Sequence, residues 1–145
     1  MGVTGAVRED GQMTVELAAA FPVLIVVAVI AVNALLLFSE CAAFDNAFRD
    51  AVRVHATSPA YGQDLEQSRA LVASTLADAF DRPFESSSVA VEGAAGGHAR
   101  FSATLEFSPT LFGLGLKTSV FGVSLPRLPH TVVLTVDCYK PGVFL

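Results

Sequence analysis

A run of 22 residues without a charge extends from Leu17 to Phe38, and Asn33 is its only polar side chain. A helix of that length covers about 33 Å at roughly 1.5 Å per residue, which is enough to cross a hydrocarbon layer of about 30 Å. The sequence therefore predicts a single-pass membrane protein with one transmembrane helix over 17–38.

The helix is expected to continue past this run as an amphipathic segment. Apolar side chains recur there at spacings of three and four, with charged residues between them, which is the pattern of a helix with one buried face. Thr14 is the predicted N-cap, and the breaker Thr57-Ser58-Pro59 is the predicted stop. We therefore expect a long helix from about Thr14 to Ala56, within a segment over 12–57 that follows an unstructured leader over 1–11. The recurring positions are Cys41, Phe44, Phe48, Val52 and His55.

The rest of the chain, 58–145, is expected to form a small α+β domain. An apolar stripe at helical spacing is followed by segments in which apolar and polar residues alternate with a period of two, which is typical of strands with one buried face. We expect an antiparallel sheet of three or four strands, with the amphipathic half of the long helix packed across it. The expected elements are a helix over 63–80, a hairpin around a turn at 93–97, a weaker strand over 118–124 and a last strand over 131–139.

The two cysteines form a candidate disulfide. Cys41 follows the predicted span and Cys138 lies in the last predicted strand, so both fall on the same side of a membrane that the chain crosses once. An oxidising extracytoplasmic space would permit a bridge that closes a loop of about a hundred residues and contributes about 3 to 5 kcal/mol. Two unpaired thiols are the alternative, because the sequence does not say whether the Cα atoms come within reach.

Composition and motifs argue against several function classes. The net charge of −5 disfavours binding to a phosphate backbone. No nucleophile with a base, pair of acids or metal-ligand spacing stands out, and the three histidines, His55, His98 and His130, are far apart in the sequence. We therefore expect no enzymatic activity, cofactor, metal, nucleic acid or small-molecule substrate.

The most specific motif lies where the leader meets the apolar run, and it is Gly11-Gln12-Met13-Thr14-Val15-Glu16-Leu17. Here the sequence resembles type IV pilin-like proteins, and most closely the TadE-like minor pilins of tight-adherence pilus systems, whose leader ends in glycine and whose fifth residue after it is glutamate. The resemblance covers 11–38 and implies cleavage by a prepilin peptidase between Gly11 and Gln12. It also implies a role in subunit assembly for Glu16, and Pro22 matches a proline common in the pilin helix.

Physical arguments accompany each part of this resemblance. Glycine at the cut site lets an extended backbone enter a protease cleft without a side chain in the way. A carboxylate such as Glu16 at the edge of an apolar helix is costly unless it is paired, and the freed α-amino group of a neighbouring subunit is a cation at the right depth. Pro22 removes one backbone hydrogen bond and should bend the span.

We therefore expect a minor pilin or pseudopilin that takes part in assembling a tight-adherence pilus. Its helix would sit in the cytoplasmic (inner) membrane with Met1 in the cytoplasm and the domain extracytoplasmic, and the protein could be incorporated in a surface pilus. The expected partners are the prepilin peptidase, other pilin or pseudopilin subunits and the membrane. The alternatives are an uncleaved single-pass envelope protein with a small interaction domain, and a pseudopilin of a competence or secretion system.

Overall fold

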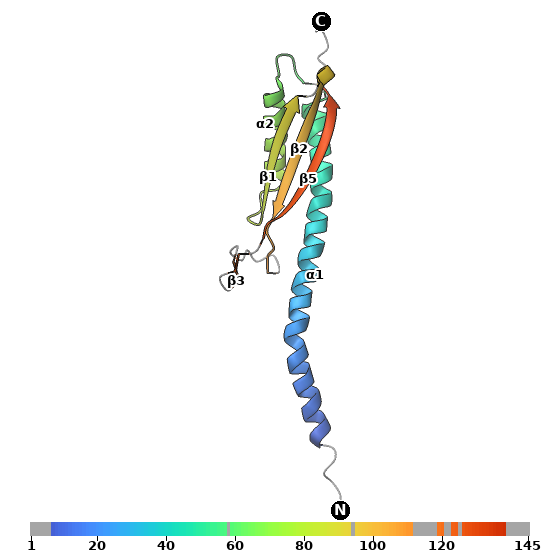
Figure 1. The fold of residues 1–145 in the computed structure, drawn as a ribbon, viewed down its shortest axis with the longest axis vertical. Helices are drawn as coiled ribbons and strands as arrows, with labels where there is room; N and C mark the ends of the chain where they lie inside the picture. The colour runs from blue at the N-terminus through green and yellow to red at the C-terminus, as the bar shows by residue number, and fades with distance from the viewer. Residues whose placement is uncertain are drawn as a thin grey trace, which may run out of the picture.

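One long helix carries a small α+β domain along its C-terminal half (Figure 1). In the computed structural model, α1 (Val7–His55) runs without interruption and is followed by α2 (Leu65–Ala79). Three long strands form the sheet: β1 (Glu85–Gly93), β2 (His98–Phe107) and β5 (Leu128–Asp137). The structure describes residues 7–57, 59–93, 95–111, 119–120, 123–124 and 126–138.

The sheet has the strand order β1-β2-β5, and both pairs are antiparallel. A short 3-10 turn, Ala95–Gly97, joins β1 to β2. Gly96 and Gly97 adopt φ values of 84° and 82° there, in a region that glycine enters without the steric penalty of a Cβ atom. The predicted hairpin around 93–97 and the predicted antiparallel sheet are confirmed, and with them the α+β fold class.

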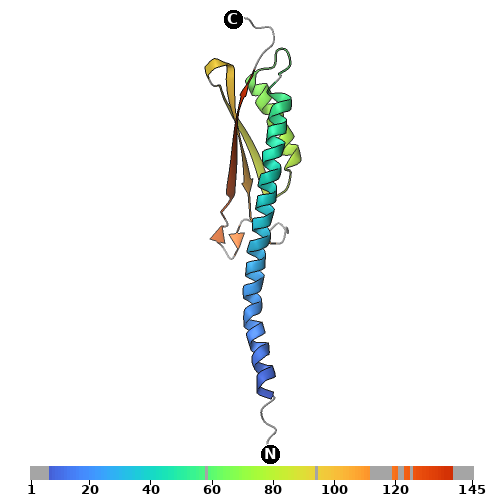
Figure 2. The same cartoon turned by 90° about the vertical axis from the view of Figure 1, so that its right-hand side faces the viewer.

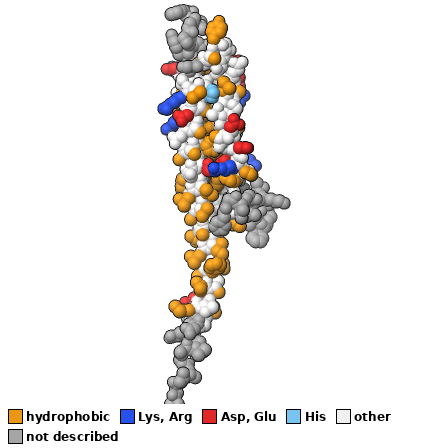
Figure 3. Space-filling view, turned by 180° about the vertical axis from the view of Figure 1, so that it is seen from behind, with side chains coloured by type: hydrophobic (Ala, Val, Ile, Leu, Met, Phe, Trp, Pro, Cys, Tyr) orange, Lys and Arg blue, Asp and Glu red, His pale blue; other side chains and the backbone are white. Residues whose placement is uncertain are grey.

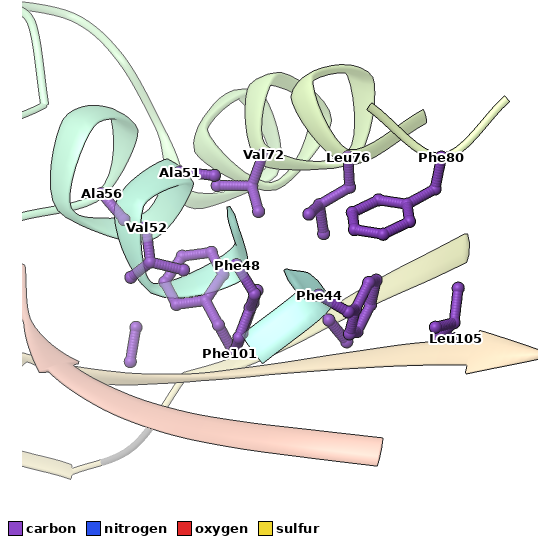
Figure 4. Packing of buried hydrophobic residues seen from close by; sticks show 12 residues of the cluster. Phe44, Phe48, Ala51, Val52, Ala56, Val72, Leu76, Phe80, Phe101 and Leu105 are labelled. Atoms are coloured by element: carbon purple, nitrogen blue, oxygen red, sulfur yellow. The ribbon is translucent and has the colours of Figure 1, made fainter. Parts of the chain in front are cut away.

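Both helices pack on the same face of the sheet, and the core lies between the two layers (Figure 2). Side chains of β2 alternate, so that Ala99, Phe101 and the following odd-numbered residues are buried. The amphipathic half of α1 packs its aromatic face against them, as predicted (Figure 4). The core members are Phe44, Phe48, Ala51, Val52, Ala56, Val72, Leu76, Phe80, Ala99, Phe101, Ala103 and Leu105.

Helix α2 begins at a capping box, which explains why the predicted second helix forms. The backbone N–H of Gln67 donates to the Asp64 carboxylate at 2.7 Å, and the backbone N–H of Asp64 donates back to the Gln67 side chain at 3.2 Å. Gln63 links the two helices, because its Nε2 donates to the carbonyl of His55 in α1 at 2.9 Å and to Ser68 Oγ in α2 at 2.8 Å. The chain therefore turns back onto the sheet directly after α1.

The start of α1 corrects the sequence analysis. The helix begins at Val7, so Thr14 is not its N-cap and residues 7–11 of the predicted unstructured leader are helical, while 1–6 lie outside the described residues. Gly11 inside a helix costs only about 1 kcal/mol, which does not end the helix at this point. The predicted stop is confirmed, because the helix ends at His55.

The weaker strand predicted over 118–124 does not join the main sheet. Two short strands, β3 (Ser119–Val120) and β4 (Val123–Ser124), pair with each other instead. The last strand, β5, begins three residues earlier than predicted, and includes Pro129, which an edge strand tolerates.

Candidate functional site

The N-terminal half of α1 projects from the domain with its apolar side chains uncovered. Among the residues that the structure describes, α1 is the one helix long and apolar enough to cross a membrane. Every residue from Met13 to Ala28 is exposed, and Figure 3 shows hydrophobic side chains along this half of the helix. So large an exposed apolar surface is unfavourable in water and is consistent with association of this segment with a membrane.

The predicted assembly residues both lie on this projecting segment. Glu16 is the only ionisable side chain from Met13 to Ser39, is exposed, and makes no hydrogen bond or ion pair with the described residues. Pro22 lies inside the helix, and its nitrogen cannot donate to the carbonyl of Ala18. An α-helix turns by about 100° per residue, so Glu16 and Pro22 point about 120° apart and do not meet.

The predicted cleavage site, the peptide bond between Gly11 and Gln12, lies within α1. A Cβ atom added to Gly11 would meet no atom within 4 Å, so packing in the folded chain does not require glycine there. Because glycine weakens a helix interior by about 1 kcal/mol relative to alanine, it eases local unwinding at this point. An unwound, extended segment is what a protease cleft accepts.

A pair of long-range hydrogen bonds fixes the base of the domain to the helix at Asn33. Its Nδ2 donates to the carbonyl of Thr110 at 2.6 Å and to that of Val29 at 2.9 Å, while the Thr110 N–H donates to Asn33 Oδ1 at 2.8 Å. These bonds satisfy an amide that would be costly to leave unpaired in apolar surroundings. The domain therefore contacts the helix at Asn33, which lies within the predicted span of 17–38.

Two carboxylates share one arginine just past the end of the predicted span. Arg82 Nη1 donates to Glu40 Oε1, and Arg82 Nε lies 3.9 Å from Glu85 Oε1. The Glu85 side chain is 1% exposed, and neither of its oxygens accepts a hydrogen bond within the described part of the chain. Burial and then the charge of Glu40 raise the pKa of the Glu85 carboxyl, although Arg82 opposes this. The cluster links α1 to the segment that leads into β1.

The candidate disulfide between Cys41 and Cys138 is not formed. Cys41 lies one helical turn before Asp45, whose Oδ1 is 2.8 Å from Nε2 of His130, near the start of β5. Cys138 lies eight residues beyond His130, which corresponds to about 26 Å along a strand. Because α1 and β5 run in the same direction, the two cysteines lie toward opposite ends of the sheet, far beyond the Cα separation of about 7 Å that a disulfide permits (Figure 1).

The three histidines lie in separate places in the fold. His55 Nε2 is 3.3 Å from Thr75 Oγ1, His98 pairs with Asp137, and His130 pairs with Asp45. Within the described ranges, no group of three or more His, Cys, Asp or Glu side chains could hold a metal ion.

Sequence reasoning missed the Asn33–Thr110 contact and the cluster of Glu40, Arg82 and Glu85. Asn33 did stand out as the one polar residue of the apolar run, but its partner is 77 residues away. Three comparisons with known proteins give no match: neither a family model, nor a curated protein, nor a solved structure is significantly similar to this chain.

Proposed function

We propose that this chain is a minor pilin or pseudopilin of a tight-adherence type pilus, anchored by α1, processed by a prepilin peptidase after Gly11, and assembled with other subunits through its helix. The observation that carries the proposal is the division of α1 into two halves. Residues 13–28 are exposed and apolar around a single carboxylate, Glu16, whereas the half beyond residue 40 packs its aromatic face on the sheet. The apolar half of such a helix is covered only by other molecules, which is what we expect of a subunit in an assembly.

The position of Glu16 supports a defined packing register. A cut after Gly11 would leave the α-amino group on Gln12, four residues before Glu16, which is about 6 Å along the helix axis. For Glu16 of one subunit to meet the amine of its neighbour, the two helices would be displaced along their axes by about this distance. The pair would neutralise a carboxylate that is otherwise expensive in an apolar layer.

An uncleaved single-pass anchor is the second candidate, and the continuity of α1 across Gly11 and Gln12 favours it. A peptidase that requires an extended backbone would have to unwind the first turns of the helix before cutting. The two candidates differ in the covalent product, so mass measurement separates them.

The test is the intact mass of the full chain extracted from membranes, with and without a co-expressed prepilin peptidase. The proposal expects a product that begins at Gln12 only when the peptidase is present, and expects Gly11→Ala to block this conversion. Gly5→Ala, a glycine replacement elsewhere in the leader, is the matched control and should be processed normally. Mature protein that keeps residues 1–11 in the presence of an active peptidase overturns the proposal in favour of the uncleaved anchor.

Assembly is tested separately with Glu16→Gln, which keeps the size of the side chain and removes its charge. We expect the variant to be processed and inserted, but differently tagged copies to co-purify from membranes several-fold less than in the unmodified protein. Glu92→Gln, which removes an exposed charge from β1, should leave co-purification unchanged. Equal co-purification of the Glu16→Gln and unmodified chains would show that the carboxylate does not mediate subunit contact.

A further inference from the structure

An apolar groove of about 600 Å³ remains between α1 and the base of the domain. Val29, Ala34 and Leu37 contribute to its helix wall, and Phe107, Leu111 and Leu128 contribute to the wall formed by the domain. The volume falls within the range of about 300–1,000 Å³ that is common for small-molecule sites.

The lining selects the chemistry of the occupant. Among the described residues of the lining, Asn33 and Thr110 are the two polar ones, and they direct their amide and backbone groups at each other. Aliphatic, aromatic and proline residues make up the rest of the lining. A groove of this kind binds a hydrocarbon by removing its surface from water and offers little to a polar or charged ligand.

The position of the groove along α1 indicates where its occupant comes from. The helix wall begins at Ile25 and ends at Leu37, so it lies inside the apolar run of 17–38. From Ile25 to Phe38 the helix rises about 20 Å, which is about two thirds of a hydrocarbon layer of about 30 Å. When α1 crosses a membrane, the groove therefore extends through the leaflet next to the domain to just past the middle of the layer.

We propose that this groove holds an acyl chain of a membrane lipid from the leaflet next to the domain. The proposal rests on membrane insertion of α1, which is part of the proposed function. A packed helix from a second copy is the other apolar occupant, and it would cover the lining and keep a lipid label away from the domain peptide.

The experiment reconstitutes the full chain in vesicles of phosphatidylethanolamine and phosphatidylglycerol that carry a photoactivatable diazirine at mid-chain. After illumination, mass spectrometry locates the labelled peptides. We expect label on the peptide that contains Phe107 and Leu111, in addition to label on the exposed face of α1. Label on α1 without label on this domain peptide overturns the lipid groove while leaving membrane insertion intact. Absence of label from α1 itself contradicts insertion, and with it the proposed function.

Variants that fill the groove provide the control. Ala34→Trp should reduce labelling of the domain peptide several-fold, whereas Ala31→Trp, on an exposed part of the same helix, should not. Leu111→Trp fills the groove from the opposite wall and serves as an independent variant if Ala34→Trp does not fold. Equal labelling of the domain peptide in the groove-filling variants and in Ala31→Trp overturns the proposal.

Discussion

Glu40 of α1 and Glu85 of β1 face the same guanidinium, that of Arg82. Glu40 accepts a hydrogen bond from it, whereas Glu85 is buried without a hydrogen bond to its carboxylate among the described residues. One cation beside two carboxylates leaves an excess negative charge at a largely buried position. Protonation of Glu85 relieves that excess, which makes the cluster sensitive to pH.

Glu85 should make the folded protein less stable as the pH rises. Its pKa in the folded state is raised above the ordinary 4.5 by burial and by Glu40, so its contribution to stability is fully present below that value and is lost as the pH rises through the folded pKa. Glu85→Gln, which resembles the protonated acid, should raise the thermal midpoint at pH 7 and flatten its pH dependence. Circular dichroism of the full chain in detergent measures both. Glu92→Gln, on the exposed face of the same strand, should change neither, and a lower midpoint for Glu85→Gln at pH 7 would contradict the assignment.

Removal of the shared cation should cost more than removal of an exposed one. Arg82→Met leaves Glu40 and Glu85 without a counter-charge, and we expect a loss of about 1–3 kcal/mol in the free energy of unfolding, since Arg82 itself is half exposed. Arg127→Met breaks an exposed pair with Glu106 and should cost less than about 1 kcal/mol. Denaturant titration in detergent compares the two variants. Equal losses in the free energy of unfolding for the two variants would show that burial of Glu40 and Glu85 does not increase the cost of removing their counter-charge.

Asn33 should hold the base of the domain against α1. Asn33→Leu removes the partners of the Thr110 backbone groups, so we expect a loss of about 1–3 kcal/mol and faster hydrogen exchange at the Thr110 amide. The control is Asn46→Leu, an exposed asparagine farther along the same helix. Exchange at Thr110 that is no faster in Asn33→Leu than in the control would contradict a fixed contact.

Truncation of two phenylalanines on α1 should lower the free energy of unfolding by very different amounts. Phe48 is fully buried against the sheet, and Phe48→Ala should lower the free energy of unfolding by about 3–5 kcal/mol. Phe38 lies ten residues earlier and is 71% exposed, so Phe38→Ala should cost little in detergent. Both are measured by denaturant titration of the full chain. A small loss for Phe48→Ala would mean that the core is not organised around this ring.

The Cys41 thiol should react slowly, and the chain should contain no internal disulfide. Burial, followed by the charges of Asp45 and Glu40, raises the pKa of this thiol above its ordinary 9.0, so little reactive thiolate is present at pH 8. In a Cys138→Ser background, Asp45→Asn should accelerate alkylation by N-ethylmaleimide, whereas Asp50→Asn should not. The unmodified chain, denatured without reductant, should take up two labels. Uptake of none would indicate a Cys41–Cys138 bridge and contradict their separation in the fold.

The spacing of apolar residues predicted the main helices and strands, because each of these elements forms by burying one apolar face. Phe44 and Phe48 recur at helical spacing and do face the core, and the alternating residues of 98–107 do form a strand with one buried face. The predicted start of α1 was wrong, because 7–11 has no apolar period and a helix that is already propagating extends by one backbone hydrogen bond per residue. Two short strands, β3 and β4, lie within the strand predicted over 118–124, and a period of two does not distinguish them from one strand.

The candidate site was harder to predict, because its contacts join residues that lie far apart in the sequence, through chemical groups that most residues carry. Thr110 meets Asn33 with its backbone N–H and carbonyl, which almost every residue carries, so no side-chain pattern marks it. Glu85 stands at a buried position of the alternating strand β1, and its conflict with Glu40 exists only once α1 packs on the sheet and both carboxylates meet Arg82. The roles of Gly11, Gln12, Glu16 and Pro22 came from a family resemblance, and these assignments stay predictions for the experiments above.

Because α1 is continuous, a tilt of its apolar half would move the domain at its other end. The helix has 49 residues and is therefore about 74 Å long, and its upper half is built into the core of the domain. A tilt of about 10° at its lower end would carry the far end sideways by about 13 Å, because α1 runs as one helix from Val7 to His55 with Pro22 inside it. The thickness of the lipid layer or the packing of neighbouring helices would set the tilt of the apolar half of α1. That tilt would in turn set the direction in which the polar face of the sheet points.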